Sequence, residues 1–326
     1  MRNLLSAWTL SLLTAISVSL PVAAQQPAYP TRPITMVVGF PPGGISDVLA
    51  RALANRLSQQ MGQSVVIDNR PGAGTTIASA LVANAAPDGY TLYFQDITTH
   101  AISASAYSRL RFDSMNDFTP VSLVASTPLM LVASLASGAK DVKTLVSEAK
   151  RLGATPLAYA SSGNGAIAHL TGETFKKVTG IEALHVPYKG GAPSIQAVLS
   201  GEVAFSFSSM PPAIMQARAD KLNALAVTTS TRVAATPEVP TLKELGIPME
   251  VVLYSGVLAP KNLPRPIVDR LNAEVGKALA SPELRQTLIN AGADARSSSP
   301  AELGALLKEQ AGTMAQAVKL ANVTLD

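Results

Sequence analysis

The sequence predicts an α/β protein made of two similar lobes. Short apolar runs alternate with helical segments, and glycine-rich loops join them. This alternation restarts after residue 135, so the order strand–helix–strand occurs in both halves of the chain. The 302 residues that follow position 24 also suit two domains better than one. These observations favour two sheets, each mainly parallel and flanked by helices.

The first half of the chain supplies the first sheet. Leu49, Leu53 and Leu57 are spaced by four residues, which places them on one face of a helix. Strand–helix–strand units in succession predict parallel strands with helices on both faces. The expected elements are a strand at 34–38, a helix at 47–60, a strand at 64–67, a helix through Ile77 and Leu81, and a strand at 90–94.

The second half repeats this pattern. Ile167, Leu170 and Phe175 share one helix face, and Gly180 ends that helix. No fixed short period occurs, so the chain is not a solenoid. The expected elements are a helix at 142–152, a strand at 157–160, a helix from 167 to 180, a strand at 184–186, a short helix ending at Gly201, and strands at 203–207 and 224–228.

Two long stretches are candidates for crossing between the lobes. Residues 118–134 are β-rich, and residues 251–259 return after Pro248. If both cross, the second lobe is inserted into the first, and the helical tail at 267–320 packs on lobe 1. Two crossings form a hinge, which suits a clamp that closes on a ligand. The predicted boundaries are 25–128 plus 249–326 for lobe 1 and 129–248 for lobe 2.

Residues 1–24 have the pattern of a secretory signal peptide. Arg2 gives a positive start, residues 4–22 carry no charge, and small residues precede a cleavage site after about Ala24. Serines and threonines interrupt the apolar run and Pro21 ends it, which disfavours the alternative of a retained membrane anchor. We therefore expect an exported, periplasmic protein.

Composition excludes several classes of function. The chain has no cysteine, so it has no disulfide framework and no thiolate metal site. Its net charge of +4 comes without a cluster of lysines and arginines, which argues against nucleic acid as a partner. His100 and His185 lack the paired spacing of metal ligands. We expect no metal, no cofactor and no nucleic-acid partner.

Three glycine-containing loops carry the expected binding chemistry. Residues 41–46 and 161–166 each join a strand to a helix, and residues 188–191 form the third loop. Ligands of parallel α/β sheets bind beyond the carboxyl ends of the strands, where helix N-termini present free N–H groups. Neither a Walker pattern nor a full Gly-x-Gly-x-x-Gly occurs, so we expect a carboxylate rather than a nucleotide phosphate. The alternative is that these glycines only make tight turns.

No catalytic constellation is found in the sequence. His169 lies one turn into the helix that follows Ser161 and Ser162, so a secreted hydrolase using Ser162 and His169 is an alternative. The Gly-x-Ser-x-Gly elbow is missing, and no acidic residue is placed to orient the imidazole. We favour a loop-bracing role for His169, and a capping or dipole role for Asp47.

The chain resembles a known family, the substrate-binding proteins of tripartite tricarboxylate transporters, which are the Bug family of bacterial periplasmic receptors. The resemblance covers nearly the whole chain beyond position 24. It rests on six motifs: Val-Gly-Phe-Pro-Pro-Gly-Gly at 38–44 with Asp47, Asn-Arg-Pro-Gly-Ala-Gly at 69–74, Pro-Asp-Gly-Tyr-Thr-Leu at 87–92, Ser-Ser-Gly-Asn-Gly at 161–165 with His169 and Leu170, Val-Pro-Tyr-Lys-Gly-Gly-Ala-Pro at 186–193, and Val-Pro-Thr at 239–241 with Glu244 and Gly246.

This resemblance implies a two-lobed periplasmic binding protein fold, with each lobe a mainly parallel sheet flanked by helices and two crossing strands between them. It implies that backbone amides, hydroxyls and bridging waters of one loop in each lobe hold a carboxylate. The ligand-binding residues that it implies are Phe40, Pro42, Gly43, Gly44, Ser46, Thr98 and Thr99 from lobe 1, and Ser161, Ser162, Gly163, Asn164, Gly165, Ala166, His169, Tyr188 and Ser206 from lobe 2.

The chain departs from the family pattern at three positions. Many members have an acidic residue where Gln196 and Ser206 stand, and a tryptophan where Tyr254 stands. The loss of the acidic residue near Ser206 disfavours an amino acid as the ligand, so we favour a dicarboxylate or an aromatic acid. The resemblance thus implies a monomeric receptor that delivers its ligand to membrane permease subunits. The alternative is a sensor of the same fold that passes its ligand to a signalling partner.

Overall fold

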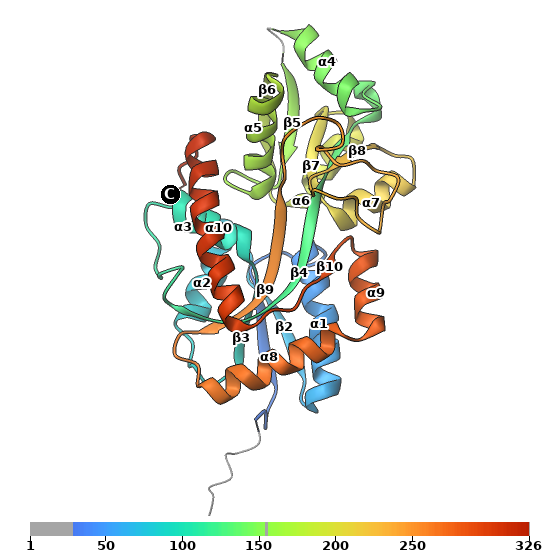
Figure 1. The fold of residues 1–326 in the computed structure, drawn as a ribbon. Coiled ribbons are helices and arrows are strands. Elements are labelled where there is room, and N and C mark those ends of the chain that lie inside the picture. The colour runs from blue at the N-terminus through green and yellow to red at the C-terminus, as the bar shows by residue number, and fades with distance from the viewer. Residues whose placement is uncertain (1–28, 154–155, 326) are drawn as a thin grey trace, which may run out of the picture.

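A computed structural model describes residues 29–153 and 156–325 of the chain. The predicted signal peptide at 1–24 lies outside these described residues. Figure 1 shows two lobes, one above the other, with β4 (Phe118–Ala133) and β9 (Val252–Pro260) running between them. The predicted two-lobed α/β class is confirmed.

The lower lobe contains a sheet in which β2, β1 and β3 are parallel neighbours, followed by the antiparallel strands β9, β4 and β10. Every residue of β1 except Thr35 is fully buried, as expected for a parallel strand covered on both faces. The strands of this lobe are β1 (Ile34–Val38), β2 (Val65–Asn69), β3 (Thr91–Asp96) and β10 (Asp294–Ala295). Its helices are α1 (Ile45–Met61), η1 (Ala73–Thr75), α2 (Thr76–Ala83), α3 (Ile97–Ala106), α8 (Arg265–Leu279) and α9 (Pro282–Asn290).

The upper lobe contains a second sheet in which β6, β5 and β7 are parallel neighbours. The second half of β4 joins this sheet and pairs antiparallel with β7 and β8. Its strands are β5 (Leu157–Ser161), β6 (Ala183–Pro187), β7 (Phe205–Ser209) and β8 (Asn223–Val227). Its helices are η2 (Leu135–Ser137), α4 (Val142–Leu152), α5 (Ile167–Thr179), α6 (Gly191–Ser200) and α7 (Met210–Arg218).

Strand β4 changes its partners between Pro128 and Leu129. Up to Pro128 it pairs with β9, and from Leu129 it pairs with β7 and β8. Buried Thr228 connects the two crossing segments at this level, because its Oγ1 accepts from the Leu129 N–H at 2.9 Å and donates to the Val251 carbonyl at 2.7 Å. The predicted crossing stretches therefore pair along β4 and β9, and Thr228 connects them where this pairing ends, while the exact lobe boundaries stay a prediction.

The C-terminal helix α10 (Pro300–Leu320) contacts both lobes. The sequence predicted that the helical tail packs on lobe 1, and α10 does pack along α3 of that lobe. It also contacts α5, and its Met314 and Val318 belong to the same apolar cluster as Phe175 of lobe 2. Helix α10 thus joins lobes that β4 and β9 already connect (Figure 1).

Candidate functional site

The first predicted loop leads from β1 into α1. Gly44 caps α1 without any side-chain hydrogen bond, so the helix start keeps backbone N–H groups that no side-chain cap occupies. Gly43 has φ +84°, and a Cβ there would meet nothing within 4 Å, so this backbone faces open space. Ser46 is 2 % exposed, and its hydroxyl has no hydrogen-bond partner within the described part of the chain. These features favour an anion at this helix start.

Asp47 organises this loop from within the first turn of α1. Its Oδ2 accepts from the Gly43 N–H at 3.0 Å, and its Oδ1 accepts from Asn69 Nδ2 at 2.9 Å. Burial alone raises the pKa of Asp47, but hydrogen bonds from Arg51, Gly43 and Asn69 outweigh it and hold that pKa below the ordinary value. The expected capping role of Asp47 is therefore to fix the loop through the Gly43 N–H. Asn69, which Asp47 holds, also donates from Nδ2 to the Phe40 carbonyl at 3.0 Å.

The predicted pair Thr98 and Thr99 lies at the start of α3. Asp96 caps this helix by accepting from the Thr99 N–H at 2.8 Å. Thr98 is fully buried, and its Oγ1 bonds the β9 backbone at the Val252 carbonyl (3.4 Å) and the Tyr254 N–H (3.3 Å). Its hydroxyl therefore connects α3 to a crossing strand in this conformation.

The second predicted loop leads from β5 into α5 and is braced from inside. Ser161 Oγ accepts from the Gly163 N–H at 3.1 Å and lies 3.0 Å from the Gly163 carbonyl. Gly163 has φ +138° and Gly165 has φ +70°, so both positions require glycine. Ala166 caps α5 without a side-chain hydrogen bond, as Gly44 caps α1. Exposed Asn164 and half-buried Ser162 complete a loop of the same kind as in lobe 1.

Two histidines hold this second loop in place. His169 Nδ1 accepts from the Gly165 N–H at 3.2 Å, which is the bracing role favoured from the sequence. His185 Nε2 lies 2.6 Å from Ser161 Oγ, a contact that the sequence reading missed. Strand register could have found it, because His185 lies opposite Tyr159 and alternate residues share a face of the sheet. Ser161 is fully buried beside His185, and His169 Nδ1 bonds Gly165 rather than Ser162, so the described residues form no exposed nucleophile–base pair here.

Three other predicted residues are covered or use their polar groups within lobe 2. The Tyr188 hydroxyl donates to Glu202 Oε1 at 2.8 Å. Ser206 is fully buried, and its Oγ donates to the Ala160 carbonyl at 2.9 Å. Leu325 packs against Gly165 and covers it. Ligand contact by these three residues therefore stays a prediction, and for the buried Ser206 and Gly165 it requires a local rearrangement.

The two lobes, the two crossing strands and one uncapped helix start in each lobe define a two-lobed binding protein of the periplasmic type. Residues 49–322 match the model of the tripartite tricarboxylate transporter family receptor, so the chain belongs to this family of solute-binding receptors. The family consists of binding proteins rather than enzymes, which removes the hydrolase alternative. Among the described residues, none of the helices combines the length and apolar character of a membrane span.

Similar proteins support this assignment. The protein BugT of Bordetella pertussis is 37% identical over 285 residues, covering 86% of each chain. The R. palustris protein Rpa4515, solved with adipate, is 35% identical with a TM-score of 0.86, covering 91% of this chain and 99% of its own. MatC from Rhodopseudomonas palustris, solved with malate, is 31% identical with a TM-score of 0.81, covering 89% of this chain and all 100% of its own.

Proposed function

We propose that this protein captures a small organic dicarboxylate between its two lobes. One observation carries the proposal: α1 in lobe 1 and α5 in lobe 2 both begin after a glycine loop, and neither start has a side-chain cap. Each helix start offers about half a positive charge and unpaired N–H groups, which suits a carboxylate. Two such starts, one in each lobe, suit an anion that bridges the lobes and thereby favours closure.

The solved relatives support the dicarboxylate class. Rpa4515 was solved with adipate and MatC with malate, and both ligands are dicarboxylates. An aromatic acid is the other ligand class that the sequence favours, and it is kept as an arm of the test below. The residues proposed to contact the carboxylate are the backbone and hydroxyls of Gly43, Gly44 and Ser46 in lobe 1 and of Ser162, Gly163 and Asn164 in lobe 2.

The proposal includes export and delivery. The charge pattern of residues 1–24 supports a signal peptide that is cleaved after about Ala24. Membership of a transporter receptor family supports delivery of the ligand to membrane permease subunits. Cells that lack the gene for this protein should therefore fail to take up a labelled dicarboxylate. They should also fail to grow on that acid as the carbon source.

A thermal-shift screen tests the binding proposal. The mature chain is heated with adipate, malate, succinate, benzoate or citrate at equal ionic strength. A ligand at about 100 times its Kd adds roughly 2.7 kcal/mol to the free energy of unfolding. For a chain of this size the midpoint should rise by about 2–4 °C. A shift with the aliphatic dicarboxylates supports the proposal, a shift with benzoate alone reassigns the ligand class, and no shift with any acid overturns it.

A further inference from the structure

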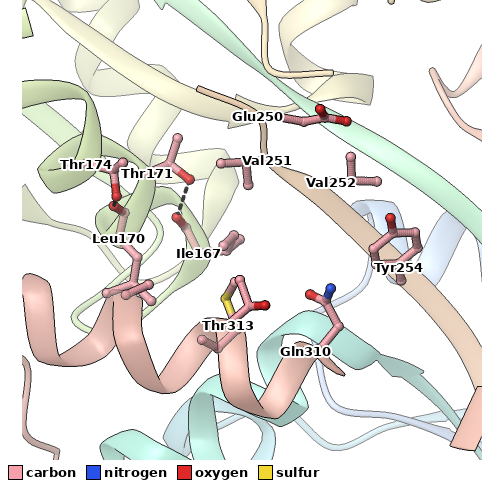
Figure 2. A pocket seen from close by; sticks show the side chains of 12 residues that line it. Ile167, Leu170, Thr171, Thr174, Glu250, Val251, Val252, Tyr254, Gln310 and Thr313 are labelled. Carbon is pink, nitrogen blue, oxygen red and sulfur yellow. Dashed lines mark hydrogen bonds between the residues drawn. The ribbon is translucent and has the colours of Figure 1, made fainter. Parts of the chain in front are cut away.

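A cavity lies beside α5, directly after the lobe 2 glycine loop. It has a volume of about 300 Å³, is partly open to solvent, and is lined by residues of α5, of β9 and the two residues before it, and of α10 (Figure 2). None of the sixteen predicted ligand-binding residues lines it. We call it the hinge cavity. Its lining comprises Ile167, Leu170, Thr171, Thr174, Glu250, Val251, Val252, Tyr254, Gln310, Thr313, Met314 and Ala317.

The hinge cavity contains polar groups without protein partners. Gln310 of α10 is 8 % exposed, and its amide makes no hydrogen bond within residues 29–153 and 156–325. Figure 2 shows the Gln310 amide and the Thr313 hydroxyl directed into the cavity, with the Tyr254 ring on the opposite strand. The side chain as a whole is largely covered, but its amide reaches the open volume of the cavity, where it is free to bond a water or a ligand.

The charges around the hinge cavity select against anions. Its lining contains the carboxylate of Glu250 and no lysine, arginine or histidine. Burial raises the pKa of Tyr254, and the nearby carboxylates of Glu309 and Glu250 raise it further, while Arg296 acts in the opposite direction. Glu250, Glu309 and Arg296 are all exposed, so solvent screens them, but the carboxylates outnumber the guanidinium two to one. A cation is therefore favoured here, in contrast to the carboxylate proposed for the loops.

The uncharged residues that line the hinge cavity indicate which other groups a bound cation should carry. Thr171 and Thr174 donate their hydroxyl protons to the carbonyls of Ile167 and Leu170 at 2.7 and 2.8 Å, so these hydroxyls remain as acceptors for a ligand. Leu170, Val252 and Met314 supply apolar surface beside them. An ammonium group with a short hydrocarbon chain matches this combination of acceptors, negative charge and apolar wall.

The position of the hinge cavity connects it to the movement of the lobes. Its α5 wall begins directly after the lobe 2 loop, and its α10 wall packs on α3 of lobe 1. Its β9 wall is bonded to α3 through Thr98 Oγ1, at the Tyr254 N–H and the Val252 carbonyl. An occupant would therefore contact elements of both lobes at the hinge, and it would bind more tightly to one arrangement of the lobes than to the other.

We propose that the hinge cavity binds a small primary ammonium ion, and that its occupation changes the affinity of the protein for its carboxylate. The first part stands independently of the proposed function, whereas the second part rests on it. Coupling of this kind is reciprocal, so the carboxylate must change the affinity for the ammonium ion by the same factor.

The mature protein labelled at its methionine methyl groups tests the first part. n-Butylammonium is titrated in the millimolar range, with n-butanol and butyrate at equal ionic strength as probes of the neutral and anionic forms. The NMR signal of Met314 should shift and saturate with n-butylammonium only, while that of Met36, buried in the lobe 1 core, should not move. A Met314 signal that never saturates with n-butylammonium, or that responds equally to butanol, overturns the proposal.

Matched variants localise the effect. Glu250→Gln and Gln310→Leu should each weaken n-butylammonium about tenfold or more, because each removes a polar contact to the ammonium group. Glu182→Gln, an exposed residue of lobe 2 outside the cavity, should bind as the parent protein does. Equal weakening by Glu182→Gln would show that the net charge of the protein, and not a contact in the hinge cavity, sets the affinity for n-butylammonium. That result would overturn the proposed cavity site.

The second part is tested with the carboxylate identified by the thermal-shift screen. Its Kd is measured with and without saturating n-butylammonium, and a change of about threefold or more is expected, in the range of typical coupling energies. An unchanged Kd beside a saturating Met314 shift overturns the coupling and leaves the cavity assignment standing. If no acid binds in the screen, the proposed function fails, while the Met314 titration still decides the cavity assignment.

Discussion

The imidazole rings of His169 and His185 stack face to face, with centroids 3.8 Å apart and planes inclined by 7°. One ring belongs to α5 and the other to β6, and both hold the lobe 2 loop through Gly165 and Ser161. His169 Nδ1 must be unprotonated to accept the Gly165 N–H. The loop that is proposed to bind the carboxylate therefore depends on a neutral His169.

Protonation of this pair should destabilise the protein as the pH falls. Burial, with smaller contributions from the neighbouring His169 and from Lys176, lowers the pKa of His185 to about 4, and Glu173 opposes this shift. The unfolded chain binds the proton more readily than the folded one, so the free energy of unfolding should decrease between pH 6.5 and 4. Because His185 is half-buried and solvent screens its charge, the decrease for this residue should be at most about 2 kcal/mol. Urea unfolding of the ligand-free protein across this range measures the effect.

His185→Gln isolates the contribution of one ring. Glutamine keeps a polar group that can reach Ser161 and does not titrate, so the variant should lose less stability between pH 6.5 and 4 than the parent protein. Lys177→Gln, an exposed change on the same lobe, should follow the parent curve. A His185→Gln curve that is parallel to the parent curve would assign the pH dependence to other groups.

Asp96 should produce the opposite pH dependence. Burial raises the pKa of this helix-capping carboxyl to about 6, although hydrogen bonds from Thr99 and Thr98 oppose the shift. Its neutral form is favoured in the folded protein, so its contribution to stability is present below pH 3.8 and is lost as the pH rises through 6. Asp96→Asn keeps the helix cap and does not titrate. On going from pH 4 to pH 8, the free energy of unfolding of this variant should therefore fall by about 2 kcal/mol less than that of the parent protein.

Asp141→Asn is the matched control for this prediction. Asp141 also caps a helix by accepting from a backbone N–H, but it is exposed, and its hydrogen bonds to Thr144 lower its pKa. Its replacement should therefore give no relative gain at pH 8. The same gain in both variants would show that capping, and not burial of Asp96, sets the pH dependence.

Much of the fold could be predicted from the sequence, because apolar spacing determines which faces are buried. Leu49, Leu53 and Leu57, expected on one face of a helix, are all at most 1 % exposed. Helices α3 and α7 were not predicted as separate elements. The ten residues of α3 include two threonines, a histidine and two serines, so its polar and apolar residues do not separate into two faces. Its burial under α10 is a tertiary effect that local spacing does not encode.

The two loops of the candidate site could also be located from the sequence, but their internal bonds could not. Glycines followed by a helix indicate where a backbone can approach a ligand, and Gly43 and Gly163 do adopt positive φ. The brace between His185 and Ser161 depends on the register of β5 and β6. The covering of Gly165 by Leu325 depends on where the chain ends up in space, 160 residues further on.

Thr228 should contribute strongly to stability at the hinge. Its hydroxyl bonds the backbone of both crossing segments, at the Leu129 N–H and the Val251 carbonyl, and it is fully buried. Thr228→Val keeps the shape but leaves these two groups without their partner. The free energy of unfolding should fall by about 2–4 kcal/mol, measured by urea denaturation. Thr229→Val, whose hydroxyl bonds only the exposed Thr231 carbonyl, should cost less than about 1 kcal/mol, and equal costs would contradict the hinge role.

Gly43→Asp should abolish carboxylate binding by placing a negative charge at the start of α1. A Cβ at this position meets nothing within 4 Å, so the side chain can be accommodated, although φ +84° strains any residue other than glycine. Gly43→Asn imposes the same backbone strain with the same side-chain shape and no charge. Calorimetric titration with the acid found in the screen should show a loss of at least about 100-fold for the aspartate and about tenfold or less for the asparagine. Equal losses would mean that backbone geometry, rather than the charge at the helix start, governs binding, and unchanged affinity in both variants would place the carboxylate elsewhere.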